Sequence, residues 1–100
     1  MPSIHPIVMP KWGLAMQEGT LAKWSAAEGD KLALGQEIMD IETSKIANVF
    51  ESPVEGTLRK RVAQDGDVLP VGALLGVVAD KGVPDSDIDA YVAAFQEKFA

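Results

Sequence analysis

Short apolar runs alternate with polar turns along most of this chain. Runs of four to eight residues bounded by Gly, Pro, Asp and Asn are typical of β-strands rather than helices. No stretch before Pro84 predicts a helix of useful length, and strands at this spacing favour a small sandwich or barrel. The pattern predicts six strands, over Ile4–Met9, Thr20–Trp24, Glu37–Thr43, Ile46–Phe50, Leu58–Val62 and Leu74–Ala79.

The pattern changes after Ala79. Residues 80–85 contain Asp, Gly and Pro and predict a linker, after which apolar residues recur at helical spacing. This stripe consists of Ile88, Tyr91, Val92, Phe95 and Phe99. We therefore divide the chain into a domain at residues 1–80 and a segment at 81–100, a linker with an amphipathic helix. We expect the helix to pack lightly on the sandwich and to lead to a catalytic domain; the alternative is that it belongs to the sandwich.

An internal repeat organises the strand-rich part. EGTLAKWSAAEGDKLALGQEIMDI, from Glu18, aligns with EGTLRKRVAQDGDVLPVGALLGVV, from Glu55. Two copies are too few for a solenoid, so they predict one fold built from two similar halves. We expect an all-β fold, a flattened barrel or sandwich of two small antiparallel sheets with pseudo-twofold symmetry. The repeat also matches Gly19 with Gly56, and four further matched glycines predict turns with positive φ: Gly29, Gly35, Gly66 and Gly72.

Composition narrows the classes of partner. The chain has no cysteine, which excludes disulfides and thiolate sites. The N-terminus lacks the features of a signal peptide, and together these observations favour a cytoplasmic location. A net charge of −6 argues against nucleic acid, and no apolar run reaches membrane-spanning length. The only basic cluster, at residues 59–61, is interpreted as a solvated strand face.

Catalytic constellations are missing from the sequence. His5 is the only histidine, which leaves no Ser-His-Asp set, and no Gly-rich phosphate loop is present. The acidic pairs in Glu28-Gly-Asp30 and Asp65-Gly-Asp67 are interpreted as turn residues rather than calcium ligands. We therefore expect no catalytic residue and no metal site in this chain.

One lysine stands out by its position. The tetrapeptide Glu42-Thr43-Ser44-Lys45 separates two predicted strands and predicts a hairpin with Lys45 at its exposed tip. An exposed lysine alone indicates only solubility. Lys45, however, lies at the junction of the two repeats, and the matching place in the second repeat, near Gly82, is where the chain leaves. This makes Lys45 a candidate reaction site.

Four segments carry a family resemblance: MPKWGLAMQEG, EGDKLALGQEIMDIETSKI, ESPVEGTL and LPVGALLGVV. Together, over about residues 4–80, they resemble the lipoyl domains of 2-oxo acid dehydrogenase complexes. The resemblance implies that Lys45 carries lipoic acid through an amide bond, with Glu42, Thr43, Ser44 and Ile46 as the modification hairpin. The family usually has Asp before the lysine and often Ala after it. Ser44 and Ile46 depart from that pattern, which bears on partner choice more than on modification.

The MPKWG loop and the tail DIDAYVAAFQEKF resemble the acetoin dehydrogenase branch, in which a catalytic domain of α/β-hydrolase type follows. The chain would then be a non-catalytic carrier within a dihydrolipoamide acetyltransferase. It would move an acyl group from a thiamine-dependent dehydrogenase component to coenzyme A, and dihydrolipoamide dehydrogenase would reoxidise it. The implied partners are those two enzymes, the acyltransferase catalytic domain and a lipoyl ligase, with neither nucleic acid nor membrane.

The loop Pro10–Gln17 has no strict counterpart in the second half, and in the family it lies beside the lipoyl-lysine turn. It carries the candidate recognition residues Lys11, Trp12, Leu14 and Met16, of which we expect Trp12 to be exposed. The alternative is that Leu14 and Met16 only cover the edge of the core. Two other functions stay open: a biotinyl carrier, which flanks its lysine with methionines, and an unmodified interaction module of the same fold.

Overall fold

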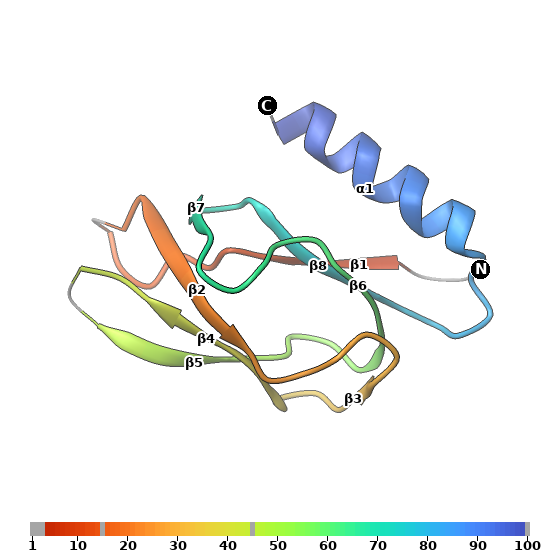
Figure 1. Cartoon of the computed structure of the whole chain (residues 1–100), viewed down its shortest axis with the longest axis horizontal. Coiled ribbons are helices and arrows are strands. Elements are labelled where there is room, and N and C mark those ends of the chain that lie inside the picture. Colours follow the sequence, from red (N-terminus) through yellow and green to blue (C-terminus); the bar gives the residue numbers. More distant parts are fainter. Residues whose placement is uncertain (1–3, 15, 45, 100) are drawn as a thin grey trace.

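A computed structural model describes residues 4–14, 16–44 and 46–99 of the chain. These residues form two four-stranded antiparallel sheets, with strand orders β1-β8-β6-β3 and β5-β4-β2-β7, and one helix (Figure 1). The predicted all-β sandwich with a C-terminal helix is confirmed. The elements are β1 (Ile4–Val8), β2 (Glu18–Trp24), β3 (Lys31–Leu32), β4 (Glu37–Glu42), β5 (Ala47–Glu51), β6 (Gly56–Arg61), β7 (Val68–Pro70), β8 (Leu74–Ala79) and α1 (Asp85–Phe99).

The two sheets follow the predicted repeat. Strands β1, β8, β6 and β3 of one sheet correspond to β5, β4, β2 and β7 of the other, in the same order. Hydrogen bonds repeat in the same way: the Trp24 amide donates to Asp65 Oδ1 (2.9 Å), and the Arg61 amide donates to Glu28 Oε2 (2.8 Å). In each half, an acidic side chain in a turn thus accepts a hydrogen bond from a backbone amide of the other half. The predicted pseudo-twofold symmetry is confirmed.

The matched glycines have the backbone that their turns require. Gly29, Gly35, Gly66 and Gly72 have φ values of 96°, 83°, 92° and 89°. An L side chain rarely adopts this region, because its Cβ meets the neighbouring backbone. These four glycines therefore lie in the tight turns between consecutive strands, as predicted.

The main core lies between the two sheets. It contains Leu21, Ile38, Met39 and Ile41 from one sheet, with Leu58, Leu75 and Val78 from the other. Trp24 is buried, and its indole Nε1–H donates to the Ala63 carbonyl (2.9 Å). The ring lies over Gly76, where a Cβ would approach the Trp24 Cη2 to 3.0 Å. Gly76 therefore makes room for the largest side chain of the core.

Strand details differ from the sequence prediction in two ways. The short strands β3 and β7 were not predicted, because two or three residues show no alternation. Ile38 and Met39 both lie in the core, beside a shift of register between Glu37 and Met39 against β5. This irregularity explains why the alternation around Ile38–Ile41 is imperfect.

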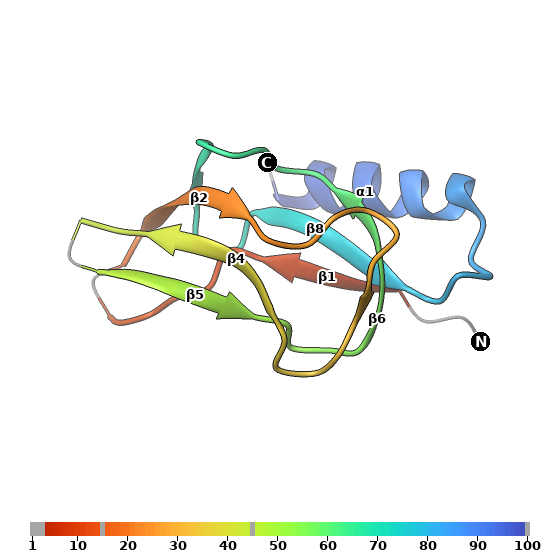
Figure 2. The same cartoon turned by 60° about the horizontal axis from the view of Figure 1, so that its bottom comes forward.

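Helix α1 packs on the outer face of the sheet that contains β8 (Figures 1 and 2). Ile88 and Val92 are buried in a second apolar cluster, and Tyr91 and Phe95 are partly buried against it. The strand side of this cluster comes from Leu74, Val77 and Ala79. The predicted amphipathic helix is confirmed, whereas a following catalytic domain stays a prediction. No helix in the described part of the chain is long and apolar enough to cross a membrane.

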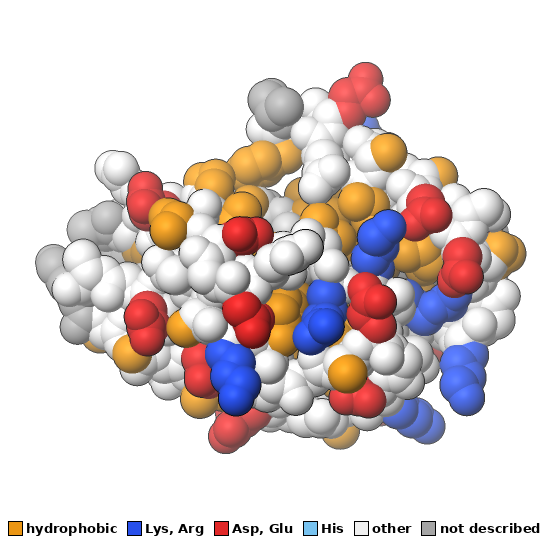
Figure 3. All heavy atoms as spheres, in the orientation of Figure 1, with side chains coloured by type: hydrophobic (Ala, Val, Ile, Leu, Met, Phe, Trp, Pro, Cys, Tyr) orange, Lys and Arg blue, Asp and Glu red, His pale blue; other side chains and the backbone are white. Residues whose placement is uncertain are grey.

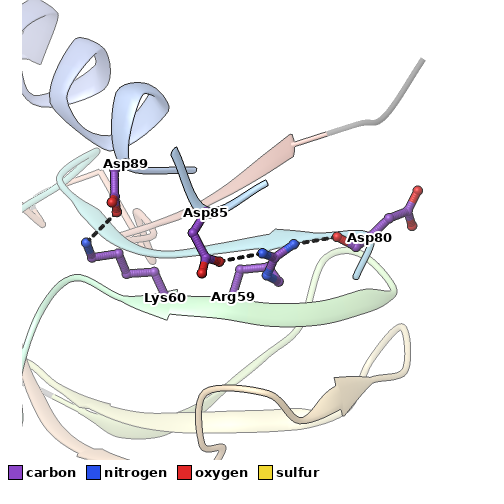
Figure 4. Close-up of polar contacts among 5 residues, drawn as sticks. All are labelled: Arg59, Lys60, Asp80, Asp85 and Asp89. Atoms are coloured by element: carbon purple, nitrogen blue, oxygen red, sulfur yellow. Dashed lines mark hydrogen bonds and ion pairs between the residues drawn. The ribbon is translucent and has the colours of Figure 1, made fainter. Parts of the chain in front are cut away.

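The basic cluster on β6 holds this helix (Figure 4). Arg59 Nη2 lies 2.8 Å from Asp85 Oδ1, Arg59 Nη1 donates to the Asp80 carbonyl (2.6 Å), and Lys60 Nζ lies 2.9 Å from Asp89 Oδ1. The Arg59 side chain is only 12% exposed. The interpretation of this residue as part of a solvated strand face was therefore wrong, because α1, about 26 residues later, covers it.

Candidate functional site

The hairpin between β4 and β5 is closed by hydrogen bonds between Thr43 and Ile46. Glu42 pairs with Ala47 at the strand ends, and beyond them the Thr43 amide donates to the Ile46 carbonyl (2.7 Å). The Ile46 amide donates in turn to Thr43 Oγ1 (3.1 Å). A threonine hydroxyl that accepts a local amide in this way fixes a turn. Only two residues, 44 and 45, lie between the closing pair.

The tip of this hairpin is accessible. Ser44 and Glu42 are exposed, Ile46 is 44% exposed, and Thr43 is partly buried. Lys45, the residue singled out from the sequence, lies outside the described residues. The described residues on either side of position 45, Ser44 and Ile46, are thus both accessible to solvent.

The loop from Pro10 to Gln17 is built around two of its own side chains. The Trp12 amide donates to Met16 Sδ (3.1 Å), and the Met16 amide donates to the Gly13 carbonyl (3.3 Å). The Trp12 ring meets Phe50 of β5 edge to face, with centroids 6.3 Å apart and planes at 65°. Such aromatic pairs add to the stabilisation from burial. The loop is thereby fixed to the strand that follows the hairpin.

This packing divides the four candidate recognition residues into two classes. Trp12 and Met16 pack against the main core, so the expectation that Trp12 is exposed was wrong. The reason is its partner Phe50, which lies in a distant strand and was not singled out from the sequence. Leu14, by contrast, is 98% exposed, and Lys11 is exposed beside it in the loop. Met16 covers the core, as the alternative interpretation had it, but Leu14 does not.

Loop and hairpin together line a groove of about 770 Å³ at one end of the sandwich. Figures 1 and 2 both place the loop and the hairpin at this end. Its lining includes Trp12, Leu14 and Met16 from the loop, Thr43 and Ile46 from the hairpin, and Gly19 and Thr20 of β2. A Cβ on Gly19 would lie 2.9 Å from Met9 Sδ and 3.2 Å from the Met16 methyl, so this glycine lets the loop settle on β2. The structure thus brings the hairpin and the recognition loop together.

Among the described residues, the charged side chains that line the groove are acidic. Glu18 and Glu42 belong to its lining. Most of the Lys and Arg side chains visible in Figure 3 lie in the half of the molecule that carries α1. A neutral or cationic ligand is therefore favoured at this end over an anion.

The second half has an equivalent turn that serves another purpose. The repeat places Asp80–Val83 over Thr43–Ile46, and there the Val83 amide donates to the Asp80 carbonyl (3.1 Å). From this turn the chain runs directly into α1. Of the two related turns, the one at Asp80–Val83 is thus the one followed by a helix within the described residues.

Comparison with known proteins agrees with this geometry. Residues 5–78 match a biotin/lipoyl family model described as "Biotin-requiring enzyme". The chain is 59% identical over 95 residues to the dihydrolipoyllysine-residue acetyltransferase component of the acetoin cleaving system of Cupriavidus necator. It is 48% identical over 99 residues to the same component of Pseudomonas putida. These alignments cover 95% and 99% of this chain but only 25% and 27% of the relatives, so the chain spans about a quarter of their length.

A solved structure supports the same assignment. The lipoyl domain of the 2-oxoglutarate dehydrogenase complex from Azotobacter vinelandii superposes with a TM-score of 0.61 and 28% identity. The match covers 78% of this chain and 98% of that domain, so the shared unit is the sandwich. The family model matches most of the chain, and the two-sheet fold is that of a solved lipoyl domain. The chain therefore belongs to the biotin/lipoyl family as a lipoyl domain.

Proposed function

We propose that this chain carries lipoic acid on Lys45 and acts as the acyl carrier of an acetyltransferase component. The system would be an acetoin-cleaving system or a related 2-oxo acid dehydrogenase complex. The observation that carries the proposal is the hairpin closed by the hydrogen bond between Thr43 and Ile46, because one of the two residues between them in the sequence is a lysine, Lys45. The 59% identity to the acetoin-cleaving component favours that branch.

The described residues fit such an attachment. In lipoyl domains the cofactor is joined to a lysine through an amide bond. Ser44 and Ile46 are exposed on either side of position 45, so a ligase can reach the turn. The hydrogen bonds between Thr43 and Ile46 fix the strand ends beneath it. The hairpin thus presents the attachment residue on a rigid base.

The protein's contribution is tethering rather than chemistry. When bound, the lipoyl group supplies a disulfide that takes up an acyl group together with two electrons. The sandwich keeps this group at a high effective concentration at each active site in turn. Neither Glu42 nor Ser44 needs to exchange a proton for this role, so the domain is non-catalytic.

The proposed partners follow from the relatives. Their names make them components of multienzyme systems. For this chain we propose a thiamine-dependent dehydrogenase, dihydrolipoamide dehydrogenase, an acyltransferase catalytic domain and a lipoyl ligase, in the cytoplasm. The catalytic domain would follow α1 in a longer protein, as the 25% coverage of the Cupriavidus relative suggests.

The loop beside the hairpin would choose the thiamine-dependent partner. Leu14 and Lys11 are its accessible side chains, while Trp12 and Met16 hold its shape. A few exposed apolar anchors commonly dominate an interface. Leu14→Ser should therefore slow reductive acylation several-fold while leaving lipoylation normal. Leu34→Ser, at another exposed leucine outside the groove, is the matched control; equal acylation rates for the two variants would remove the loop from recognition.

Lipoylation in vitro tests the attachment site. A lipoyl ligase should add one lipoyl group to the chain, and the modified peptide should contain Lys45. Lys45→Gln should abolish the addition, whereas Lys11→Gln, in the neighbouring loop, should not. Both variants should keep the wild-type melting temperature, because exposed substitutions change stability by about 0.5 kcal/mol or less. Lipoylation that survives Lys45→Gln would overturn the proposal.

A biotinyl carrier is the second candidate, because the family model covers both kinds of domain. Ser44 and Ile46 stand where biotinyl domains have methionines, which favours the lipoyl assignment. A biotin ligase assayed beside the lipoyl ligase separates the two functions. An unmodified interaction module would accept neither group.

A further inference from the structure

The groove between the loop and the hairpin has an apolar lining that the attachment of a cofactor at the hairpin does not by itself explain. Five large apolar side chains are markedly exposed among the described residues: Leu14, Leu34, Ile46, Val68 and Phe99. Two of them, Leu14 at 98% and Ile46 at 44%, line this one groove from its loop and hairpin sides. Exposed apolar groups that gather around a concavity mark a binding surface.

We propose that this groove is a resting dock for the lipoyl arm of the same chain. The inference rests on the proposed attachment to Lys45. Both sequence neighbours of that residue, Ser44 and Ile46, line the groove. A group attached between them starts at the edge of the groove and needs no second molecule to reach it.

The chemistry of the lining fits this occupant. An amide-linked lipoyl group is uncharged, and it consists of a methylene chain that ends in a dithiolane ring. Leu14, Ile46 and the Met16 side chain offer apolar contacts for the methylenes. Glu18 and Glu42 at the groove disfavour an anionic occupant, whereas a neutral arm suffers no such repulsion.

The base of the groove is already in place before an arm arrives. Met16 is held by two hydrogen bonds: its backbone amide donates to the Gly13 carbonyl, and its sulfur accepts from the Trp12 amide. Trp12 is held by Phe50. Thioether and aromatic groups are polarizable and make favourable contacts with sulfur. A pre-formed lining of this kind lowers the ordering cost of docking.

A tethered group can occupy its binding site for much of the time even when its intrinsic affinity for that site is weak. The attachment gives the arm an effective concentration in the millimolar range for short flexible tethers. Leu14 and Ile46 in its lining are exposed to solvent, so the arm can leave the groove for an active site. The dock would shield the dithiolane between transfers, and each partner would compete with the groove for the arm.

The test compares nuclear magnetic resonance spectra of the whole chain with and without the lipoyl group, with mass spectrometry confirming the group on Lys45. Lipoylation should shift the indole N–H signal of Trp12 and the methyl signals of Leu14 and Met16. Nuclear Overhauser contacts should join the arm to Met16. Trp24 is the internal control, because its indole is buried and bonded to Ala63. Its signal should not move.

Matched variants separate docking from a mere neighbour effect. Leu14→Ser should reduce the contacts between the arm and Met16 several-fold, while Leu34→Ser should leave them unchanged. Shifts confined to residues 43–47 in a fully lipoylated sample would overturn the dock and leave the carrier function intact. Shifts in the groove that grow with protein concentration would also overturn it, because a second copy would then be the occupant. Failure of lipoylation itself would be a failure of the proposed function instead.

Discussion

The two outer faces of the sandwich share one backbone and differ in chemistry. On β8 the outward positions are apolar, and on β4 the repeat places acidic residues at the same positions. The pairs are Leu74 and Glu37, Val77 and Asp40, and Ala79 and Glu42. Helix α1 covers the apolar face, and the acidic face has no helix on it within the described residues (Figure 2).

This difference between the faces explains why one of the two equivalent turns leads into a helix. The turn at Asp80–Val83 leads into α1, whose buried side chains need the apolar face of β8. The turn at Thr43–Ile46 follows β4, which carries the acidic residues, and its described residues share a groove with the recognition loop and β2. The two halves of the repeat thus differ in role: one half binds α1, and the other contains the hairpin proposed to carry the lipoyl group.

The largest effect on stability is expected when two equivalent residues of the two outer faces, Val77 and Asp40, are each replaced by the other's residue type. Val77 is fully buried, so Val77→Asp places an unpaired charge beneath α1 and should cost roughly 3 kcal/mol or more. Asp40→Val, at the matching position, should change stability by about 0.5 kcal/mol or less. Urea unfolding of both variants measures this. Equal losses would mean that the two outer faces do not differ in burial.

The turn glycines allow a second comparison. Gly66 and Gly82 both have free space where a Cβ would lie, but only Gly66 has a positive φ, at 92°. Gly66→Val should therefore cost about 1–2 kcal/mol through backbone strain. Gly82→Val should cost about 0.5 kcal/mol or less. Thermal unfolding measures both, and a similar loss at the two sites would exclude φ as the cause.

Amide exchange probes how firmly α1 belongs to the sandwich. The amides from Ile88 to Val92 should be protected, because these two side chains are buried, but less than those of β8. Protection should fall toward Phe99, whose side chain is 44% exposed. If α1 is protected as strongly as β8, the helix is part of the domain and a boundary at residue 80 is wrong.

The contact between α1 and β6 should weaken at high pH. The hydrogen bond and charge of Asp89 raise the pKa of Lys60 above 10.5, and burial raises the pKa of Tyr91 above 10.0. Both pKa values are raised in the folded state, so the contribution of each group to stability is constant below about pH 10 and stability is lost as the pH rises through the raised values.

Exchange rates across α1, measured on either side of pH 10.5, test this smallest effect. They should rise more steeply in α1 than in β4, beyond the general base dependence of exchange. Asp89→Asn should lower the pKa of Lys60 toward its ordinary value. A pH response of α1 that matches β4 would show that neither Lys60 nor Tyr91 contributes to the contact.

Much of the fold could be predicted because the repeat encodes it. The alignment of Glu18 with Glu55 predicted two similar halves, their matching turns and the positive φ of Gly29 and Gly66. Strands β3 and β7 could not be predicted, since two or three residues pair only when the rest of the sheet positions them.

The surroundings of the site were less predictable than its hairpin. Contacts such as Trp12 on Phe50, or Arg59 on Asp85, join residues far apart in the sequence. Pattern and composition report on neighbours along the chain and carry no signal for these pairs. Sequence therefore indicated the hairpin and the loop, while their packing and the groove between them came from the structure.

The proposed attachment of one lipoyl group to Lys45 can be read from the mass of the protein itself. Intact mass and peptide mapping of the protein purified from its native host should show a single lipoyl addition, on the peptide that contains Glu42 to Ile46. A biotinyl addition, an addition on any other lysine, or a fully unmodified chain in cells grown with lipoic acid would contradict it.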